Sequence, residues 1–152
     1  MILIVVSAVV FLDQLTKFFA QSNLILNQPV PVIKNFFYFT LVHNRGAAFG
    51  LLQNQVNIFI LTALLAIILL YLDVRKHKTA GSYIYKFTIG LLLAGAFGNL
   101  IDRLYLGYVV DFLDFRVWPV FNVADSAITI GAILLGWSIL KSQSHKVTKS
   151  HV

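Results

Sequence analysis

The acidic residues of this chain are few and of one kind. All six are aspartates, and no glutamate occurs among the 152 residues, of which 12% are charged. Five of the six flank apolar segments: Asp13, Asp102, Asp111, Asp114 and Asp125. Two neighbouring carboxylates can hydrolyse a peptide bond without a metal, because the ionised one takes a proton from water while the protonated one polarises the carbonyl. These residues therefore favour acid–base catalysis by a pair of aspartates.

The electrostatics of such a pair predict that it holds one proton at neutral pH. Two like charges about 4 Å apart repel by about 4 kcal/mol at an effective dielectric near 20, which corresponds to about 3 pK units. The alternative is that each aspartate is an interfacial helix cap or ion-pair partner. Five carboxylates at the ends of apolar segments make that alternative weaker. If these segments cross a membrane, carboxylates near it persist mainly where they have partners or a task. The residues alone do not identify which two form the pair.

Two clusters of polar residues accompany these aspartates at helical spacing. Asp13 and Lys17 are four residues apart, a spacing that allows an ion pair on one helix face. Asn99, Asp102 and Arg103 stand at i, i+3 and i+4, so they also share a face. Both clusters are candidates for a site that a substrate or a catalytic aspartate contacts.

Two further polar groups admit a structural and a functional interpretation. Asn122 precedes Asp125 by three residues, so it could cap a helix whose first turn Asp125 complements. Asn44 is followed by Arg45 and Gly46, and the glycine permits a sharp turn or the close approach of a bound backbone. The alternatives are a plain N-cap and a plain surface turn.

Other catalytic chemistries have thin support. The chain has no cysteine, which excludes disulfides and thiolate nucleophiles. Its four histidines lack the spacing of known metal-ligand motifs, so neither a metal nor another cofactor is expected. A Ser126–Lys17 dyad is conceivable, but Ser126 is better explained as a small residue that packs between helices.

The elements that must position these side chains are membrane-spanning helices. Hydrophobic residues make up 59% of the chain and its mean hydropathy is +0.82, and a spanning helix needs about 20 mostly apolar residues. The predicted spans are residues 1–20, 54–73, 83–103 and 122–140. The first apolar run could instead be the core of a cleaved signal peptide, but no basic segment precedes it. We therefore expect an all-α polytopic membrane protein with one domain, residues 1–152.

Residues 24–50 read as a small β-sheet unit. The segment is short, aromatic and rich in β-branched residues, and a Lys34-Asn35 turn signal divides it. We expect an antiparallel unit on the membrane surface, with its aromatic residues at the level of the lipid headgroups. Residues 104–120 are expected to form a loop that helps to cover the same end of the bundle.

The distribution of basic residues predicts the orientation. An even number of spans places both termini on one side, and that side carries seven of the twelve basic residues. The positive-inside rule therefore places the termini in the cytoplasm and the aspartate-rich rim at the outer face.

Five motifs occur in the order in which one known family has them. They are DQLTK (13–17), NRGAAF (44–49), GAFGNLIDR (95–103), GYVVDF (107–112) and FNVADS (121–126). Together with the four-span profile, they resemble lipoprotein signal peptidase, also called signal peptidase II. The resemblance covers nearly the whole chain.

The resemblance implies an activity. Members of this family are aspartic endopeptidases of the bacterial inner membrane that remove signal peptides from prolipoproteins, cutting before a cysteine that carries diacylglycerol. It also implies that globomycin-type peptide inhibitors bind in the cleft. The basic residues are scattered or lie beside apolar segments instead of forming a patch, so nucleic acid is not expected as a partner. A second subunit is not expected to be required.

The resemblance also assigns roles to residues. The choice of Asp111 over Asp114 or Asp102 depends on it alone. By this comparison the catalytic residues are Asp111 and Asp125, the substrate-binding residues are Asn44, Gly46, Asn99, Arg103 and Asn122, and the supporting residues are Asp13, Lys17 and Asp102.

Two other classes of function are open on the residues alone. One is a small transporter or proton relay, whose carboxylates bind and release protons or cations. Its carboxylates should be distributed through the bilayer, whereas here they gather at one edge. The other is a membrane adaptor without catalytic activity, in which the aspartates could be neutralised without loss.

Overall fold

The computed structural model describes residues 1–46, 54–76 and 82–149. Within these residues four helices are long and apolar enough to cross a membrane, as the hydropathy pattern predicts. They are α1 (Ile2–Asn23), α2 (Val56–Lys76), α3 (Tyr83–Leu106) and α4 (Val123–Lys149). Residues 47–53, which include the end of the predicted β unit and the last three residues of the NRGAAF motif, lie outside the described part.

The α3 helix is the centre of the bundle. It contacts α1, α2 and α4, whereas α2 contacts no described helix other than α3. Small residues on α3 allow this close packing, and Gly98 is the clearest case, because a Cβ atom there would lie 2.6 Å from Oδ2 of Asp13. The glycine thus makes room for a carboxylate of α1.

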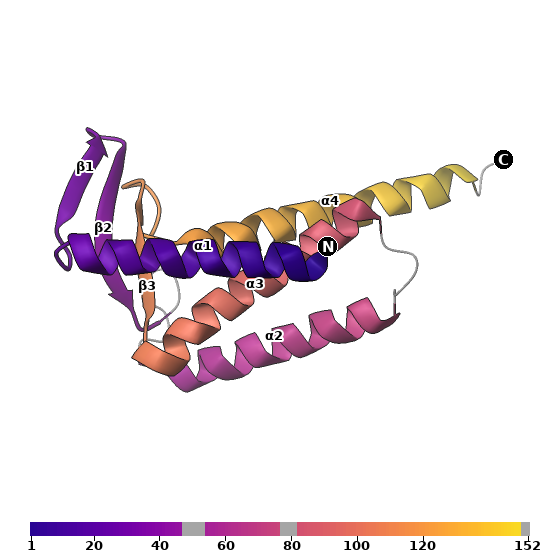
Figure 1. Ribbon diagram of the computed structural model, residues 1–152. Helices are drawn as coiled ribbons and strands as arrows, with labels where there is room; N and C mark the ends of the chain where they lie inside the picture. The colour runs from indigo at the N-terminus through magenta and orange to yellow at the C-terminus, as the bar shows by residue number, and fades with distance from the viewer. Residues whose placement is uncertain (47–53, 77–81, 150–152) are drawn as a thin grey trace.

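A three-stranded antiparallel sheet lies across one end of the bundle (Figure 1). Its strands are β1 (Pro29–Ile33), β2 (Phe37–Asn44) and β3 (Val109–Asp114), in the order β1-β2-β3. The predicted turn joins β1 to β2, and Asn35 adopts a left-handed conformation there with a φ of 65°. The β unit predicted within residues 24–50 is therefore confirmed for its described part.

The third strand corrects the prediction of a loop over residues 104–120. Val109–Asp114 pairs with β2, and its register places Asp111 opposite Val42 and Val109 opposite Asn44. The alternation of a strand then separates its side chains onto two faces. Phe112 packs in a small core with Ala20 of α1, whereas Asp111 lies on the opposite face.

Short connections bring the ends of α3 and α4 to this strand. Gly107 ends α3 in a left-handed conformation, with a φ of 76° and its backbone N–H donated to the carbonyl of Arg103. Because β3 begins only two residues later, Asp111 returns to the end of α3 that carries Asn99 and Asp102.

Candidate active site

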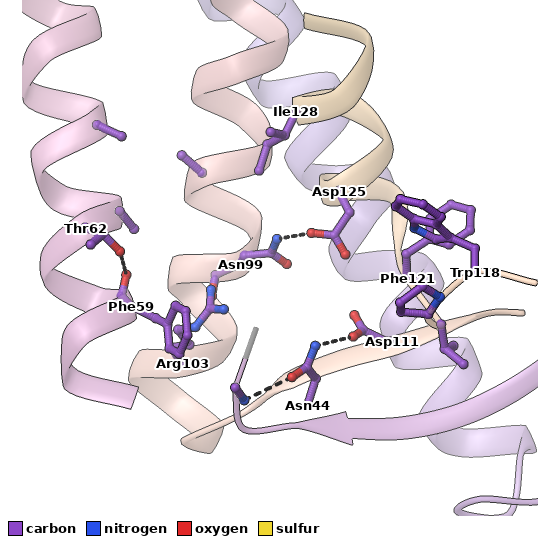
Figure 2. A pocket seen from close by; sticks show the side chains of 16 residues that line it. Asn44, Phe59, Thr62, Asn99, Arg103, Asp111, Trp118, Phe121, Asp125 and Ile128 are labelled. Atoms are coloured by element: carbon purple, nitrogen blue, oxygen red, sulfur yellow. Dashed lines mark hydrogen bonds between the residues drawn. The ribbon is translucent and has the colours of Figure 1, made fainter. Parts of the chain in front are cut away.

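A cavity of about 420 Å³ lies where α2, α3, α4 and the sheet meet. Figure 2 shows that Asp111 and Asp125 both point into it, from the sheet and from the first turn of α4. Its polar lining consists largely of residues predicted from the sequence: Asn44, Gly46, Asn99, Arg103, Asp111 and Asp125. Its apolar lining includes Phe59, Trp118, Phe121 and Ile128.

Asn122 joins the two carboxylates. Its side-chain Nδ2 donates to Oδ1 of Asp111 at 2.7 Å, and its backbone N–H donates to Oδ2 of Asp125 at 3.3 Å. Its Oδ1 in turn accepts the backbone N–H of Asp125 at 2.8 Å. The N-cap interpretation of Asn122 is therefore confirmed, and the residue that caps α4 also contacts Asp111.

Two more amides complete the contacts of the carboxylates. Asn99 donates from Nδ2 to Oδ1 of Asp125 at 2.8 Å, and Asn44 donates from Nδ2 to Oδ2 of Asp111 at 2.9 Å. The oxygen of Asn44 accepts the backbone N–H of Gly46 at 3.0 Å. The oxygen of Asn99 accepts from Nδ2 of Asn122 at 3.1 Å. The oxygens of all three asparagines are thus occupied by donors, so each amide is oriented with its NH₂ group toward an aspartate.

The environment of Asp111 favours its protonated form. The residue is 1% exposed, and its burial, together with the nearby Asp125 carboxylate, raises its pKa from 3.8 to about 7. The hydrogen bonds from Asn44 and Asn122 act in the opposite direction and offset only part of this shift. A carboxyl group of this kind can be protonated or ionised near neutral pH.

A buried lysine lies at the centre of a second cluster behind the cavity. Lys17 is 2% exposed, and its Nζ lies 2.8 Å from Oδ2 of Asp13 and 2.9 Å from Oδ2 of Asp102. The same ammonium donates to Oδ1 of Asn99 at 3.1 Å. The predicted Asp13–Lys17 pair is therefore present, and it continues through Asn99 to Asp125.

The two carboxylates of this cluster hold the backbone next to the two cavity aspartates. Oδ2 of Asp102 accepts the N–H of Val110 at 3.0 Å, one residue before Asp111. Oδ1 of Asp13 accepts the N–H of Ala124 at 2.9 Å, one residue before Asp125. The Lys17 cluster thus fixes β3 and the start of α4 relative to each other.

Comparisons with known proteins match this arrangement to one family. The model of signal peptidase (SPase) II matches residues 5–141. The chain belongs to the signal peptidase II family. It is 49% identical over 142 residues to the lipoprotein signal peptidase of Caldanaerobacter subterraneus subsp. tengcongensis, covering 92% of this chain and 96% of that protein. It is 46% identical over 137 residues to that of Clostridioides difficile, covering 88% and 90%.

A solved structure shares the fold. It is a bacterial membrane enzyme determined by the in meso method at 2.3 Å resolution, with a TM-score of 0.89 and 35% identity. The match covers 95% of this chain and 90% of that one. The resemblance to signal peptidase II and the membrane-protein fold class are both confirmed.

The remaining aspartate of the sheet lies apart from the cavity of this family member. Asp114 is three residues beyond Asp111 and therefore on the other face of β3. It accepts hydrogen bonds from Oγ1 of Thr40 at 2.7 Å and from the backbone N–H of Arg116 at 2.8 Å. Burial acts to raise its pKa, but these bonds and the Arg116 charge together outweigh burial and lower the pKa, as expected for a carboxylate with a structural task.

The structure lends no support to the competing sites. Ser126 donates from its hydroxyl to the carbonyl of Asn122 at 2.9 Å, and the Lys17 ammonium is occupied by the contacts above. The His43 ring stacks on Tyr108 at a centroid distance of 4.0 Å, and the other three histidine side chains lie outside the described part. Among the described residues, no group of three or more histidines or acidic residues could hold a metal.

Sequence reasoning missed two contributors to the site. Gln14 donates from Nε2 to Oδ1 of Asp102 at 2.9 Å and so braces the Lys17 cluster. Phe59 lies beneath the guanidinium of Arg103, with 5.0 Å between the Arg103 Cζ and the ring centroid. Gln14 could have been found from its place beside Asp13, but Phe59 lies in a uniformly apolar span that offers no chemical signal.

Proposed function

We propose that this chain is an aspartic endopeptidase that removes signal peptides from prolipoproteins, cleaving before a diacylglyceryl-modified cysteine. The observation that carries the proposal is the pair of carboxylates on one cavity, buried Asp111 and partly buried Asp125, which Asn122 joins. Family membership supports the substrate class, since the relatives are named lipoprotein signal peptidases.

The proposed mechanism uses the two aspartates in opposite protonation states. The ionised carboxylate takes a proton from a water molecule, whose oxygen attacks the scissile carbonyl. The protonated carboxylate donates to the carbonyl oxygen, and a proton then passes to the leaving amine as the tetrahedral intermediate breaks down. The oriented amides of Asn44, Asn99 and Asn122 hold the pair in place and solvate its negative charge.

Arg103 and the loop between β3 and α4 complete the proposed substrate site. Arg103 lines the cavity and contributes the positive charge there, held over Phe59 of α2. Trp118 and Phe121 form an apolar wall beside the carboxylates, which excludes bulk water from the reacting bond. Globomycin-type peptides are proposed to bind in this cavity.

The location of the site fits a substrate that is itself embedded in the membrane. The site lies at one end of four helices that can span a bilayer (Figure 1), where both water and an apolar signal peptide can reach it. We place the protein in the bacterial inner membrane, with the termini in the cytoplasm and the sheet at the outer face, on the charge distribution of the loops. The transporter alternative has no support from the family match.

Cleavage of a diacylated prolipoprotein by purified protein in detergent tests the proposal. Asp111→Asn and Asp125→Asn should each abolish cleavage while leaving the helical content unchanged, because each removes one half of the acid–base pair. Asp114→Asn is the matched control and should retain most activity. A chelator should change nothing. Normal cleavage by both single variants would show that the two-aspartate mechanism is wrong.

A further inference from the structure

The guanidinium of Arg103 lies in the cavity without an ion pair. Its Nη1 donates a long hydrogen bond to the carbonyl oxygen of Asn99 at 3.4 Å. No carboxylate in the described part of the chain lies within ion-pair distance of it. The charges of Asp111 and Asp125 nevertheless act on the guanidinium, since both aspartates line the same cavity. A cation therefore stands near two carboxylates that it does not contact.

The place of Arg103 on α3 would allow such an ion pair. Arg103 stands four residues after Asn99 and shares its helix face, and the amide of Asn99 donates to Oδ1 of Asp125 at 2.8 Å. Guanidinium and carboxylate groups form short and often bidentate pairs when they meet. Some other group must therefore hold the guanidinium away from the aspartates.

Phe59 of α2 is the group that the guanidinium contacts instead. The Arg103 Cζ lies 5.0 Å from the centroid of the Phe59 ring, within the range of a cation–π interaction. Figure 2 shows the guanidinium beside this ring on one side of the cavity, with Asp111 and Asp125 on the other. The other described residues of α2 that line the cavity have no ring; they are Thr62, Ala63 and Ala66.

The four carboxylate oxygens of the pair already accept hydrogen bonds from uncharged groups. Asp111 accepts from the amides of Asn44 and Asn122 at 2.9 and 2.7 Å. Asp125 accepts from Nδ2 of Asn99 at 2.8 Å and from the backbone N–H of Asn122 at 3.3 Å. These donors orient the carboxylates without adding a full positive charge. A pair that is held in this way can keep a shared proton at neutral pH.

The other charges that act on this region are already compensated. They belong to Asp13, Lys17 and Asp102, which form one ion-paired cluster. No described residue of α2 that lines the cavity is charged. The position of the Arg103 guanidinium thus decides how much positive charge reaches the pair. Contact with an arginine lowers the pKa of an aspartate by about 1–3, which would remove the proton of Asp111 at neutral pH.

We propose that Phe59 is a positioning residue, which holds the Arg103 guanidinium away from Asp111 and Asp125 so that the two aspartates keep their shared proton. This inference rests on the proposed function, because the protonated carboxyl group is the acid of the proposed mechanism. A single ring of α2 thereby protects the protonation state of a pair to which it donates no hydrogen bond.

The pH–rate profile of Phe59→Leu tests this proposal. The variant keeps an apolar side chain but removes the ring, so the guanidinium can reach the aspartates. The fall of kcat on the alkaline side should move to lower pH by about one unit or more. Phe59→Tyr keeps a ring face and should restore the profile. Phe11→Leu is the matched control and should leave the profile unchanged, since Phe11 is 68% exposed on α1 and does not line the cavity.

Removing the charge of Arg103 separates its effect from a general loss of packing. In an Arg103→Gln background, Phe59→Leu should leave the titration of the pair unchanged, because no guanidinium is left to approach it. Infrared absorption of the protonated carboxyl group follows this titration without substrate, and the signal that Asp111→Asn removes belongs to Asp111. That signal should persist to about pH 7 in the parent, disappear at lower pH in Phe59→Leu and return in the double variant.

Three results would overturn the proposal. One is an Asp111 signal that titrates at the same pH in Phe59→Leu and in the parent. The second is an equal shift with and without the Arg103 charge, and the third is a shift that Phe59→Tyr does not reverse. Cleavage of the prolipoprotein by Asp111→Asn would instead refute the catalytic pair itself, so the two failures are distinguishable.

Discussion

Removing the ammonium of Lys17 should strongly destabilise the protein. The side chain is 2% exposed and contacts two carboxylates, those of Asp13 and Asp102, which are 0% and 3% exposed. Lys17→Met would leave both carboxylates buried without a cation. Breaking a buried ion pair by removing one partner costs about 3–5 kcal/mol, which lowers the unfolding temperature of a chain of this size by about 6–20 °C.

The measurement is thermal unfolding in detergent, followed by circular dichroism. Lys34→Met is the matched control, because Lys34 lies exposed in the turn between β1 and β2, and it should change the unfolding free energy by no more than about 0.5 kcal/mol.

A double variant separates charge from packing. If the cost comes from uncompensated carboxylates, Lys17→Met with Asp13→Asn should be more stable than Lys17→Met alone, since one of the buried charges is gone. The coupling between directly interacting residues is about 0.5–3 kcal/mol. Strictly additive losses, or a Lys17→Met protein that unfolds at the parent temperature, would refute the reasoning.

Three further predictions follow from the site and the helix packing. The cleavage rate should fall as the pH rises above about 7. The pKa of Asp111 is raised to about 7, so above this pH the aspartate pair loses its shared proton. A cleavage rate that is flat from pH 6 to 9 would contradict this. Asn44→Ala should move that fall to higher pH, because the lost hydrogen bond stabilised the ionised form of Asp111; a pH–rate profile of the variant settles the direction. Gly95→Ala should lower both stability and activity, because its Cβ would lie 2.4 Å from the carbonyl oxygen of Ala124. Gly136→Ala is the control. Its Cβ would meet nothing within 4 Å, so it should be neutral in the same unfolding and cleavage assays.

The pH dependence of stability has the same origin and a defined sign. Because the pKa of Asp111 is higher in the folded protein than the ordinary value of 3.8, the folded state binds this proton more tightly than the unfolded state. The free energy of unfolding should therefore decrease as the pH rises from about 4 to about 7. Asp111→Asn should remove this part of the pH dependence, which can be measured by unfolding at several pH values.

The spanning helices could be predicted because their signal is local. Each is a run of apolar residues long enough to cross a bilayer, and its ends are marked by charged or polar residues. The turn at Asn35 and the ion pair of Asp13 with Lys17 were also predictable, since both depend on residues within four positions of one another.

The third strand was missed because its partner lies far away in the sequence. Nothing within Val109–Asp114 shows that it pairs with β2, some seventy residues earlier. The same limit explains why Asp111 could not be chosen over Asp114 from the residues alone. The two differ by three positions, and only the existence of a strand places them on opposite faces.

The contacts between the polar clusters could not be predicted from residue spacing either, because they join different helices. The spacing of Asn99 and Asp102 showed that they share a helix face, but not that Lys17 of another helix would lie between them. Asn122 was assigned two alternative tasks, and the structure shows that its oxygen caps α4 while its nitrogen contacts Asp111.

The α2 helix forms a wall of the cavity but lies outside the network that holds the two aspartates. The hydrogen bonds that hold the two aspartates come from α1, α3, α4 and the sheet, and none of those described comes from α2. The side-chain links from α2 to α3 include Phe59 beneath Arg103 at one end and Asp73 with Tyr85 at the other. A substitution on α2 consequently alters one wall of the cavity without removing any of these hydrogen bonds, so the breadth of accepted sequences and the speed of bond cleavage can be tuned by different parts of the molecule.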